Sequence, residues 1–510
     1  MNKKTISRTI ILLAILLLCT AMGTFYYMKL ELQEKNGKTD LFSLIPEDSQ
    51  AIIEVNNIHN LFQNLRYTAF SEAYKKSEMS DLIHLLDERF NALAEHKAHG
   101  LGGQMNHLLI SFHSPGNSAD QVIYGHLNNE NRNFIDSLLK QNHTAASFQK
   151  EIEYNGESIF IYPLNNEKFL ACYFQKGFYA ISFQKKLIEK VIDTYRQRMP
   201  SIRNDSVFTS LSTQKKPANS LYLYVRSQPL SNWTEFNILI HNDAIYMAGN
   251  CSDAPPNSLA HILTGGKKVS LIADRMLPEK TFLFYQLAIS DGKSILPSFR
   301  KDSVSSTARY AFSDFIREYT QGEVSSIEFE GNDSPHLHHL LIFPLSQPFT
   351  GIEPPWKNIL QTPSTHKRIN GNVYTLSPVE TGIFTNKLIP HSNSNEAAPL
   401  YATLFNRQLL LSDKTEDLIC YVQQITDSAK EQQPVFQKEM TDLSQQPNFT
   451  LFIDMEKILK YPQKYAQYMP SFLFKHKEFF QNFTFSLQLV KVPENINANV
   501  ILTYKLIDNN

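Results

Sequence analysis

Hydrophobic residues alternate with polar ones along much of the chain, which is the pattern of strands that bury one face. Asn155-Gly156 separates two of these alternating runs. Because both residues of this pair tolerate positive φ, the pair predicts a hairpin turn. The runs predict strands at 50–55, 107–113, 121–125, 148–154, 158–162, 169–174, 178–181, 220–225, 236–240, 245–248 and around 483–489.

Helical spacing follows some of the predicted strands. Leu187, Ile188 and Val191 recur at intervals that place apolar side chains on one face of a helix, and Ser182 can cap its start. A second helix is predicted after Ser80. The predicted fold class is therefore α+β, with mainly antiparallel sheets that carry helices on one face.

Several blocks of residues recur later in the chain in the same order. They pair 45–48 with 277–280, 107–110 with 339–342, 171–191 with 402–422 and 217–223 with 447–453, at offsets of 230 to 232 residues. In the third block Ser182 falls on Asp413, and both residue types favour the N-cap of a helix. Asn155-Gly156 matches Asn370-Gly371 at an offset of 215, as loops of unequal length would cause. These matches predict an internal duplication that gives two related sheet domains.

The N-terminal residues have the pattern of a membrane anchor. Residues 1–8 contain three basic residues and no acidic one, and residues 9–28 contain no charge. A helix of that length spans about 30 Å, which is the thickness of the hydrocarbon core. Since basic flanks stay in the cytoplasm, we expect a single-pass protein of the inner (cytoplasmic) membrane with the bulk of the chain in the periplasm.

Two other targeting signals compete with a retained anchor. A cleavable signal peptide needs small residues before the cut, and Ala21-Met22-Gly23 would serve. The apolar run continues past that site to Met28, which favours retention. A lipoprotein signal would use Cys19, but Leu18 precedes it where a small residue is expected.

These patterns together predict the organisation of the whole chain. We expect a cytoplasmic basic segment at 1–8, a transmembrane signal anchor at 9–28, a tether at 29–40, a first α+β repeat at 41–254, a linker at 255–270 and a second α+β repeat at 271–510.

Composition narrows the class of protein. Hydrophobic residues make up 42% and aromatic residues 12% of the 510 residues, which indicates folded domains and not a disordered chain. A net charge of -1 supplies no basic surface for nucleic acid, so no nucleic-acid partner is expected. Beyond Cys19 there are three cysteines, Cys172, Cys251 and Cys420, which cannot all pair within one chain, so a disulfide framework is not expected.

Catalytic signatures are missing from the sequence. It lacks G-x-S-x-G, H-E-x-x-H, C-x-x-C and G-x-G-x-x-G, so we predict no catalytic residue and no cofactor. His336 and His338 would share a face of a strand and are weak candidates for metal binding. A polar strand face explains them better, because no nearby Cys or carboxylate-His spacing completes a site.

The opening Leu44-Ile45-Pro46-Glu47-Asp48-Ser49, followed by Ala51-Ile52-Ile53-Glu54-Val55-Asn56, resembles that of uncharacterised Gram-negative, Bacteroidetes-like envelope proteins grouped as a domain of unknown function. The resemblance covers about a tenth of the chain. It implies an exported protein with a strand-rich body, and it supplies no catalytic residues.

Three functions remain open from the sequence. The preferred one is a membrane-anchored, non-enzymatic scaffold or binding module that presents two related domains to an envelope protein or peptide. The alternative is a hydrolase of envelope polymers with its site in the cleft between the repeats, where interdomain pockets tend to form. The third is a chaperone-like sheet that receives extended peptides at an edge strand.

Overall fold

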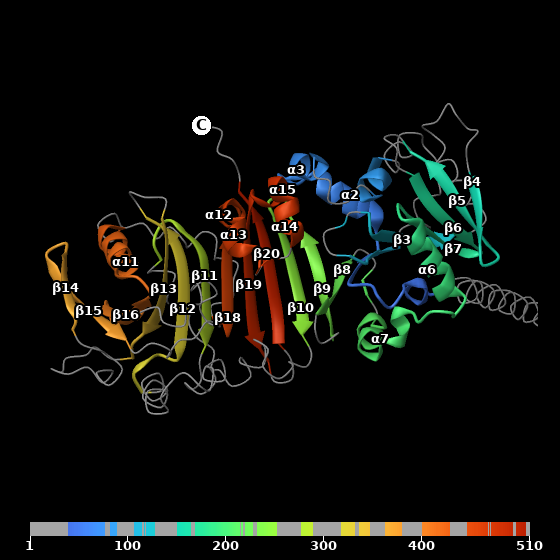
Figure 1. The fold of residues 1–510 in the computed structure, drawn as a ribbon. Helices are drawn as coiled ribbons and strands as arrows, with labels where there is room; N and C mark the ends of the chain where they lie inside the picture. Colours follow the sequence, from blue (N-terminus) through green and yellow to red (C-terminus); the bar gives the residue numbers. More distant parts are fainter. Residues whose placement is uncertain are drawn as a thin grey trace, which may run out of the picture. The chain divides into compact units, whose positions relative to one another are not determined.

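The fold was analysed in a computed structural model (Figure 1). It describes residues 39–76, 82–88, 107–114, 117, 119–127, 150–164, 169–214, 216–217, 220–227, 232–251, 277–288, 318–331, 336–346, 363–379, 400–428, 446–467, 469, 471–492 and 496–505. The chain divides into two compact units. Unit 1 comprises 1–58, 85–113 and 119–214, and unit 2 comprises 59–84, 114–118 and 215–510.

Unit 1 is built on an antiparallel sheet with the strand order β1-β2-β3-β7-β6-β5-β4. Its strands are β1 (Ala51–Val55), β2 (Leu108–Phe112), β3 (Gln121–Leu127), β4 (Lys150–Tyr154), β5 (Glu157–Pro163), β6 (Phe169–Gln175) and β7 (Gly177–Ser182). The predicted hairpin at Asn155-Gly156 is confirmed, since it joins β4 to β5 and both residues have positive φ. The tyrosines Tyr124, Tyr173 and Tyr179 are fully buried in this unit.

Helices of unit 1 pack close to strands β6 and β7. The helix α6 (Lys185–Tyr195) packs on these strands with Leu187, Ile188, Val191 and Ile192 buried. Three shorter helices follow one another away from α6: η1 (Leu41–Leu44) contacts α6, η3 (Ile202–Asn204) contacts η1, and α7 (Ser206–Ser212) contacts η3. The predicted helix after Ser182 is therefore confirmed.

Unit 2 holds a longer antiparallel sheet. Its strand order is β8-β9-β10-β20-β19-β18-β11-β12-β13-β17-β16-β15-β14. The strands are β8 (Leu221–Ser227), β9 (Asn232–Ile240), β10 (Ala244–Cys251), β11 (Thr281–Ala288), β12 (Glu323–Glu330), β13 (Leu337–Pro344), β14 (Thr365–Ile369), β15 (Asn372–Val379), β16 (Leu400–Phe405), β17 (Gln408–Ser412), β18 (Phe449–Asp454), β19 (Phe483–Lys491) and β20 (Ile496–Tyr504).

Helices cover both faces of the unit 2 sheet. Phe452 and Ile453 are neighbours on β18 and point to opposite faces. Phe452 lies in one apolar cluster with α11, and Ile453 lies in another with α12 and α15. The helices of this unit are α2 (Ile58–Arg66), α3 (Ser71–Lys76), α11 (Thr415–Ser428), α12 (Met455–Lys460), α13 (Pro462–Tyr465), α14 (Ser471–Lys475) and α15 (Lys477–Phe480).

The strand order of unit 1 recurs within unit 2 as β11-β12-β13-β17-β16-β15-β14. The likeness extends to the helix that follows the last strand of each set. Ser182 Oγ accepts a hydrogen bond from the backbone N–H of Gln184 at 3.0 Å, and Ser412 Oγ accepts one from Lys414 at 3.2 Å. Buried positions then repeat at 187, 188, 191 and 192 and at 417, 418, 421 and 422.

Two of the residue blocks matched in the sequence are misaligned. The match of 107–110 with 339–342 joins β2 to β13, but the strand order makes β12 the equivalent of β2. Ser182 corresponds to Ser412 and not to Asp413, because the capping bonds and the buried positions both follow an offset of 230. Short apolar runs align well at wrong registers, since any strand with one buried face resembles another.

The predicted fold class is wrong. Antiparallel strands dominate the described residues, and helices cover both faces of the unit 2 sheet, where helices on one face were expected. Consecutive apolar residues such as Ile501 and Leu502 on β20 place an apolar side chain on each face of the strand. Both faces of the sheet therefore need a covering layer of helices. The predicted linker at 255–270 lies outside the described residues, so the predicted domain limits stay a prediction.

Within the described residues, no helix is both long and apolar enough to cross a membrane. The helix α11, for example, has 14 residues, which span about 21 Å, and it carries Glu416 and Asp417 in its first turn. This finding contradicts the predicted single-pass location in the inner membrane, which is corrected accordingly. The segments 1–8 and 9–28 and most of the tether lie outside the described residues.

Candidate functional site

The turn before β1 connects two parts of unit 1. Ser49 N–H donates to the carbonyl of Pro46 at 3.2 Å and closes the turn. Glu47 N–H donates to the carbonyl of Pro200 at 3.2 Å, and Ile202 N–H donates to the carbonyl of Ile45 at 2.9 Å. The loop after α6 is therefore tied to the start of the fold by backbone bonds.

Asp48, at the end of this turn, starts a chain of polar side chains. His113 Nδ1 lies 3.0 Å from Asp48 Oδ1, and His113 Nε2 lies 2.9 Å from Ser111 Oγ. Ser111 Oγ lies 3.3 Å from the hydroxyl of Tyr124. Lys190 on α6 forms an ion pair with the second oxygen of Asp48. We call these residues the Asp48 relay.

Neighbouring charges and burial shift pKa values in opposite directions within the Asp48 relay. The hydrogen bond from His113, with help from Lys190, holds the pKa of Asp48 well below its usual range in spite of partial burial. Burial raises the pKa of Tyr124 far above its usual value, so its hydroxyl stays protonated. The relay therefore ends in a charged carboxylate at one side and in a neutral phenol at the other.

The connections among Asp48, His113 and Ser111 are those of a Ser-His-Asp triad, in which an acid orients an imidazole that takes the proton of a serine. However, the triad-like residues are not accessible to a substrate. Ser111 is completely buried, and the side chain of His113 is 4% exposed. In this conformation no substrate can reach the Ser111 hydroxyl, and the relay fastens the turn before β1 to the sheet.

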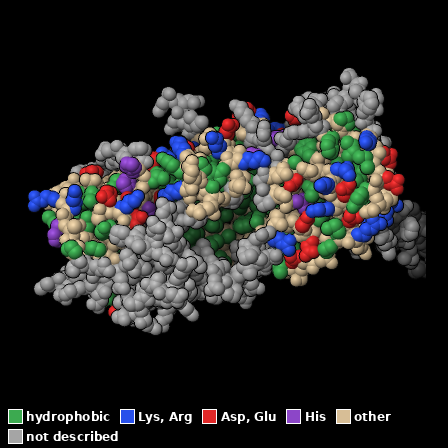
Figure 2. Space-filling model, in the orientation of Figure 1, with side chains coloured by type: hydrophobic (Ala, Val, Ile, Leu, Met, Phe, Trp, Pro, Cys, Tyr) green, Lys and Arg blue, Asp and Glu red, His purple; other side chains and the backbone are tan. Residues whose placement is uncertain are grey.

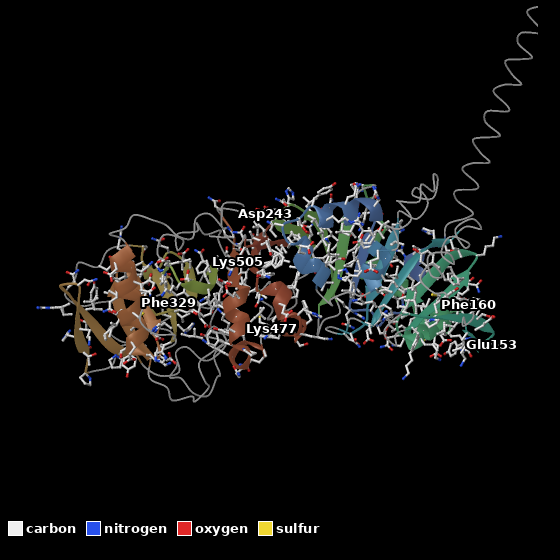
Figure 3. The ribbon with its side chains drawn as sticks, turned by 90° about the horizontal axis from the view of Figure 1, so that it is seen from above. Glu153, Phe160, Asp243, Phe329, Lys477 and Lys505 are labelled. Atoms are coloured by element: carbon white, nitrogen blue, oxygen red, sulfur yellow. The ribbon has the colours of Figure 1, made fainter. Side chains whose placement is uncertain are left out.

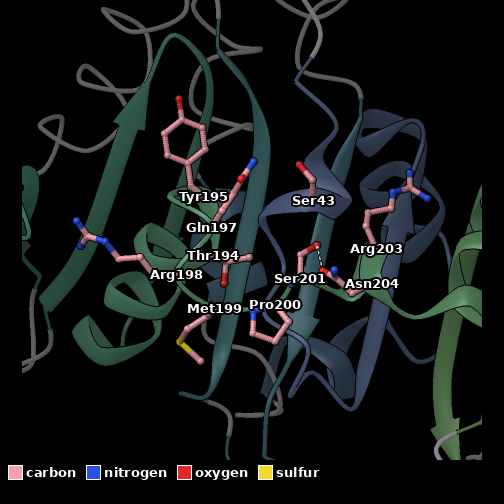
Figure 4. Close-up of a pocket in the computed structure, with 10 residues that line it drawn as sticks. All are labelled: Ser43, Thr194, Tyr195, Gln197, Arg198, Met199, Pro200, Ser201, Arg203 and Asn204. Atoms are coloured by element: carbon pink, nitrogen blue, oxygen red, sulfur yellow. Dashed lines mark hydrogen bonds between the residues drawn. The ribbon is translucent and has the colours of Figure 1, made fainter.

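A cleft of about 570 Å³ opens beside the same loop of unit 1 (Figure 4). It is formed by Ser43 of η1, by the end of α6 and by the loop that runs to Asn204. Arg198 and Arg203 lie on opposite sides of it, and no carboxylate is among the lining residues. Tyr195 adds an exposed aromatic ring.

The two arginines of the cleft differ in how firmly carboxylates hold their guanidinium groups. Arg203 donates to Asp40 through Nε at 2.6 Å and through Nη2 at 3.0 Å, so its guanidinium is committed to that carboxylate. Arg198 is 51% exposed, and its nearest approach to Asp193 is 3.7 Å. Arg198 can therefore turn to an anionic group that enters the cleft at little cost.

The weak metal candidates His336 and His338 lie at the start of β13. His338 Nδ1 is 2.8 Å from Asp417 Oδ1, and its ring stacks on Phe329 with centroids 5.3 Å apart. The backbone carbonyl of His336 accepts a bond from Gly331. In the part of the chain that the structure describes, no group of three or more His, Cys, Asp or Glu could hold a metal ion.

Sequence reasoning missed both the Asp48 relay and the cleft. Asp48 is 65 residues from His113, and Ser111 and His113 belong to no catalytic motif. The signal available was the spacing of Ser111 and His113, which places two polar side chains on one face near the end of a strand. On the face shown in Figure 2, basic and acidic side chains of unit 1 are interspersed, so that view offers no broad surface of one sign.

Comparison with known proteins adds little to this geometry. No protein-family model matches the chain, and no curated protein matches its sequence. Crystal form III of TP0453 matches with 10% identity and a TM-score of 0.24, over 46% of this chain and 89% of that one. Crystal form I of TP0453 matches with 9% identity and a TM-score of 0.25, over 43% of this chain and 82% of that one. TM-scores of this size support no conclusion, and the resemblance to envelope proteins stays a prediction.

Proposed function

We propose that the protein is a binding module without catalytic activity of its own, and that it takes a small anionic ligand in the cleft of unit 1. The observation that carries the proposal is Arg198, which is 51% exposed and lines a cleft that has no carboxylate among its lining residues. Arginine presents a planar fork that suits carboxylates and phosphates.

Other features of unit 1 support the same role. The loop that lines the cleft is held at Pro200 and Ile202 by backbone bonds to the turn before β1, so its shape is present before a ligand arrives. A preformed site loses less conformational entropy on binding. The buried hydroxyl of Ser111 gives the neighbouring relay no route to a substrate.

Titration calorimetry on the full-length protein, with citrate and inorganic phosphate as probes, tests the proposal. We expect the unmodified protein to bind at least one of these anions. Arg198→Gln should weaken that binding about tenfold, because it removes a charge-assisted hydrogen bond. Lys186→Gln is the matched control, since Lys186 is an exposed cation on α6 that does not line the cleft.

Either of two results would overturn the proposal. One is that neither anion binds the unmodified protein. The other is that Arg198→Gln and Lys186→Gln bind with the same affinity as the unmodified protein, because binding would then not depend on the cleft.

A serine hydrolase is the second candidate. The order of contacts from Asp48 through His113 to Ser111 favours it, but it requires another conformation, in which the now buried Ser111 is open to a substrate. A fluorophosphonate probe reacts with activated serines. An adduct on Ser111 that disappears in His113→Ala would replace the binding module with the hydrolase. A native protein that forms no adduct counts against the hydrolase.

A further inference from the structure

Strand β14 is the last strand of the unit 2 sheet. It pairs with β15, and it pairs with no other strand among the described residues. In Figures 1 and 3 it lies at the end of the sheet, next to α11. In the part of the chain that the structure describes, the outer side of β14 is therefore an edge without a neighbouring strand.

The turn of this hairpin shows which backbone groups of β14 point outward. The two-residue loop 370–371 has φ of 47° and 87°, and Ile369 lies opposite Asn372. In such a hairpin the residues that flank the loop form a hydrogen-bonded pair, and bonded pairs alternate with non-bonded ones along the strands. His366 and Arg368 thus belong to non-bonded pairs, and their backbone N–H and C=O groups point to the outer edge.

The hairpin is held in shape although most of β14 is exposed. Ile369 is 4% exposed and lies in the same apolar cluster as Leu376 of β15. Asn370 Nδ2 donates to Asp427 of α11 at 3.2 Å. Residues 365–368 are exposed. The edge is therefore ordered before a partner arrives, which lowers the entropy cost of binding.

The exposed part of β14 is basic. It carries His366, Lys367 and Arg368 in succession, and the hairpin at 363–379 contains no aspartate or glutamate. Among the described residues, neither Lys367 nor Arg368 has a carboxylate as an ion-pair partner. Figure 2 shows Lys and Arg side chains at this end of the sheet. Because successive side chains of a strand point to opposite faces, each face of the sheet has a cation beside the outer edge.

The basic side chains decide which kind of strand can pair with this edge. Charges on an edge strand usually prevent the edges of two copies from pairing, because they bring like charges together. A strand of opposite charge is attracted instead, since directly opposed side chains of paired strands lie about 5 Å apart. The edge of β14 therefore favours an acidic strand over a second copy of this chain.

We propose that β14 binds an extended acidic segment of a partner protein, which adds to the unit 2 sheet as one more strand. Backbone hydrogen bonds to His366 and Arg368 hold the segment along the edge. Its carboxylates pair with the side chains of Lys367 and Arg368. This site belongs to unit 2 and does not depend on the anion cleft of unit 1.

Fluorescence anisotropy with the full-length protein and labelled peptides tests the proposal. The probe is the peptide Thr-Val-Thr-Glu-Glu-Glu-Thr-Val-Thr, and we expect it to bind. A peptide with glutamine in place of each glutamate should bind about tenfold more weakly, because it loses the charge pairs. A peptide that keeps its glutamates but is N-methylated at each of them should not bind measurably, because its central amides cannot donate to the edge.

Variants of β14 separate the role of charge from that of the backbone. Lys367→Gln/Arg368→Gln should weaken binding of the acidic peptide about tenfold. Lys280→Gln/Lys477→Gln is the matched control, since both lysines are exposed cations of unit 2 outside β14. His366→Pro removes an outward N–H that is not bonded to β15, so it should weaken binding about fivefold, whereas His366→Thr keeps this N–H and should bind normally.

Several results would overturn the proposal. One is that the acidic peptide does not bind, or binds no more tightly than the glutamine peptide. Another is equal binding of the N-methylated peptide, which would mean attraction between charges without strand pairing. Unchanged binding in Lys367→Gln/Arg368→Gln would place the peptide elsewhere. A dimer that dissociates in His366→Pro would assign the edge to a second copy of this chain.

Discussion

His113 Nδ1 lies 3.0 Å from the carboxylate of Asp48, and this contact joins the end of β2 to the turn that precedes β1. Removing the charge with Asp48→Asn should lower the free energy of unfolding at pH 7 by about 1 kcal/mol, a discounted value because the Asp48 side chain is 44% exposed. Urea unfolding of both proteins measures the difference.

The pH dependence of this effect has a definite sign. The pKa of Asp48 is depressed in the folded protein, so its stabilisation is present above the ordinary value of 3.8 and is lost as the pH falls further. The difference between Asp48→Asn and the unmodified protein should shrink in acid. Lys190→Met, which leaves the His113 contact in place, should cost less. Equal stability of Asp48→Asn at pH 7 would show that the contact does not stabilise unit 1.

Glu323, completely buried on β12, should make unit 2 less stable at alkaline pH. Burial raises the pKa of Glu323 from 4.5 to about 7, although Gln286 Nε2 donates to its carboxylate at 2.7 Å. The neutral form is thus favoured in the folded state. Its advantage is complete below pH 4.5 and is lost as the pH rises through 7.

Glu323→Gln should therefore raise the free energy of unfolding at pH 8 by up to about 3 kcal/mol and change it little at pH 4. Thermal unfolding at the two pH values is the measurement. Glu279→Gln is the control, since Glu279 is exposed in the turn before β11. A Glu323→Gln protein with the same pH dependence as the unmodified one would contradict the expectation.

Gly125 on β3 lies directly opposite Tyr179 on β7, and the tyrosine ring fills the place of a side chain. A Cβ at Gly125 would lie 2.4 to 2.6 Å from the Tyr179 hydroxyl and ring. Because Tyr179 is 1% exposed and has no room to move, Gly125→Ala should lower the free energy of unfolding by about 2 kcal/mol.

A smaller side chain at position 179 should relieve this clash. In the double variant Gly125→Ala/Tyr179→Leu the cost of the alanine should be smaller than in the single variant, measured as a coupling energy by urea unfolding. Additive costs would mean that the ring does not oppose the Cβ.

The turns at Asn155 and Asn370 have the same construction in the two units, with φ of 53° and 47°. Each amide Nδ2 donates to a helix carboxylate, to Asp193 at 3.0 Å and to Asp427 at 3.2 Å. Asn155→Ala and Asn370→Ala should each cost about 1 kcal/mol, because alanine tolerates positive φ poorly and lacks the amide. Thermal unfolding that shifts for only one variant would show that the likeness of the turns is one of shape alone.

Local patterns in the sequence predict the strands well. The run at 169–174 becomes β6 (Phe169–Gln175), the run at 178–181 falls within β7 (Gly177–Ser182), and the Asn-Gly hairpin forms where expected. These features depend on neighbours in sequence, namely alternation of side chains and turn residues that accept positive φ.

Those local patterns could not predict which strands distant in sequence pair with each other. Nothing in the residues of β3 specifies that Ile123 pairs with Ile181 of β7 and not with a strand nearer in sequence. The Asp48 relay was equally hard to predict, because Asp48, Ser111 and Tyr124 come together only when β1, β2 and β3 pair. The site was therefore less predictable than the strands, because it depends on pairing as well as on periodicity.

The pairing of β10 with β20 has a consequence for the order of events during synthesis. These strands pair from Ala244 with Thr503 to Cys251 with Ile496. As the ribosome proceeds from one end of the chain to the other, β10 emerges long before its partner and keeps an open edge until β20 follows. Such an edge invites pairing with other nascent chains. On β10 this edge therefore stays open until β20, the last strand among the described residues, has been made and has paired with it.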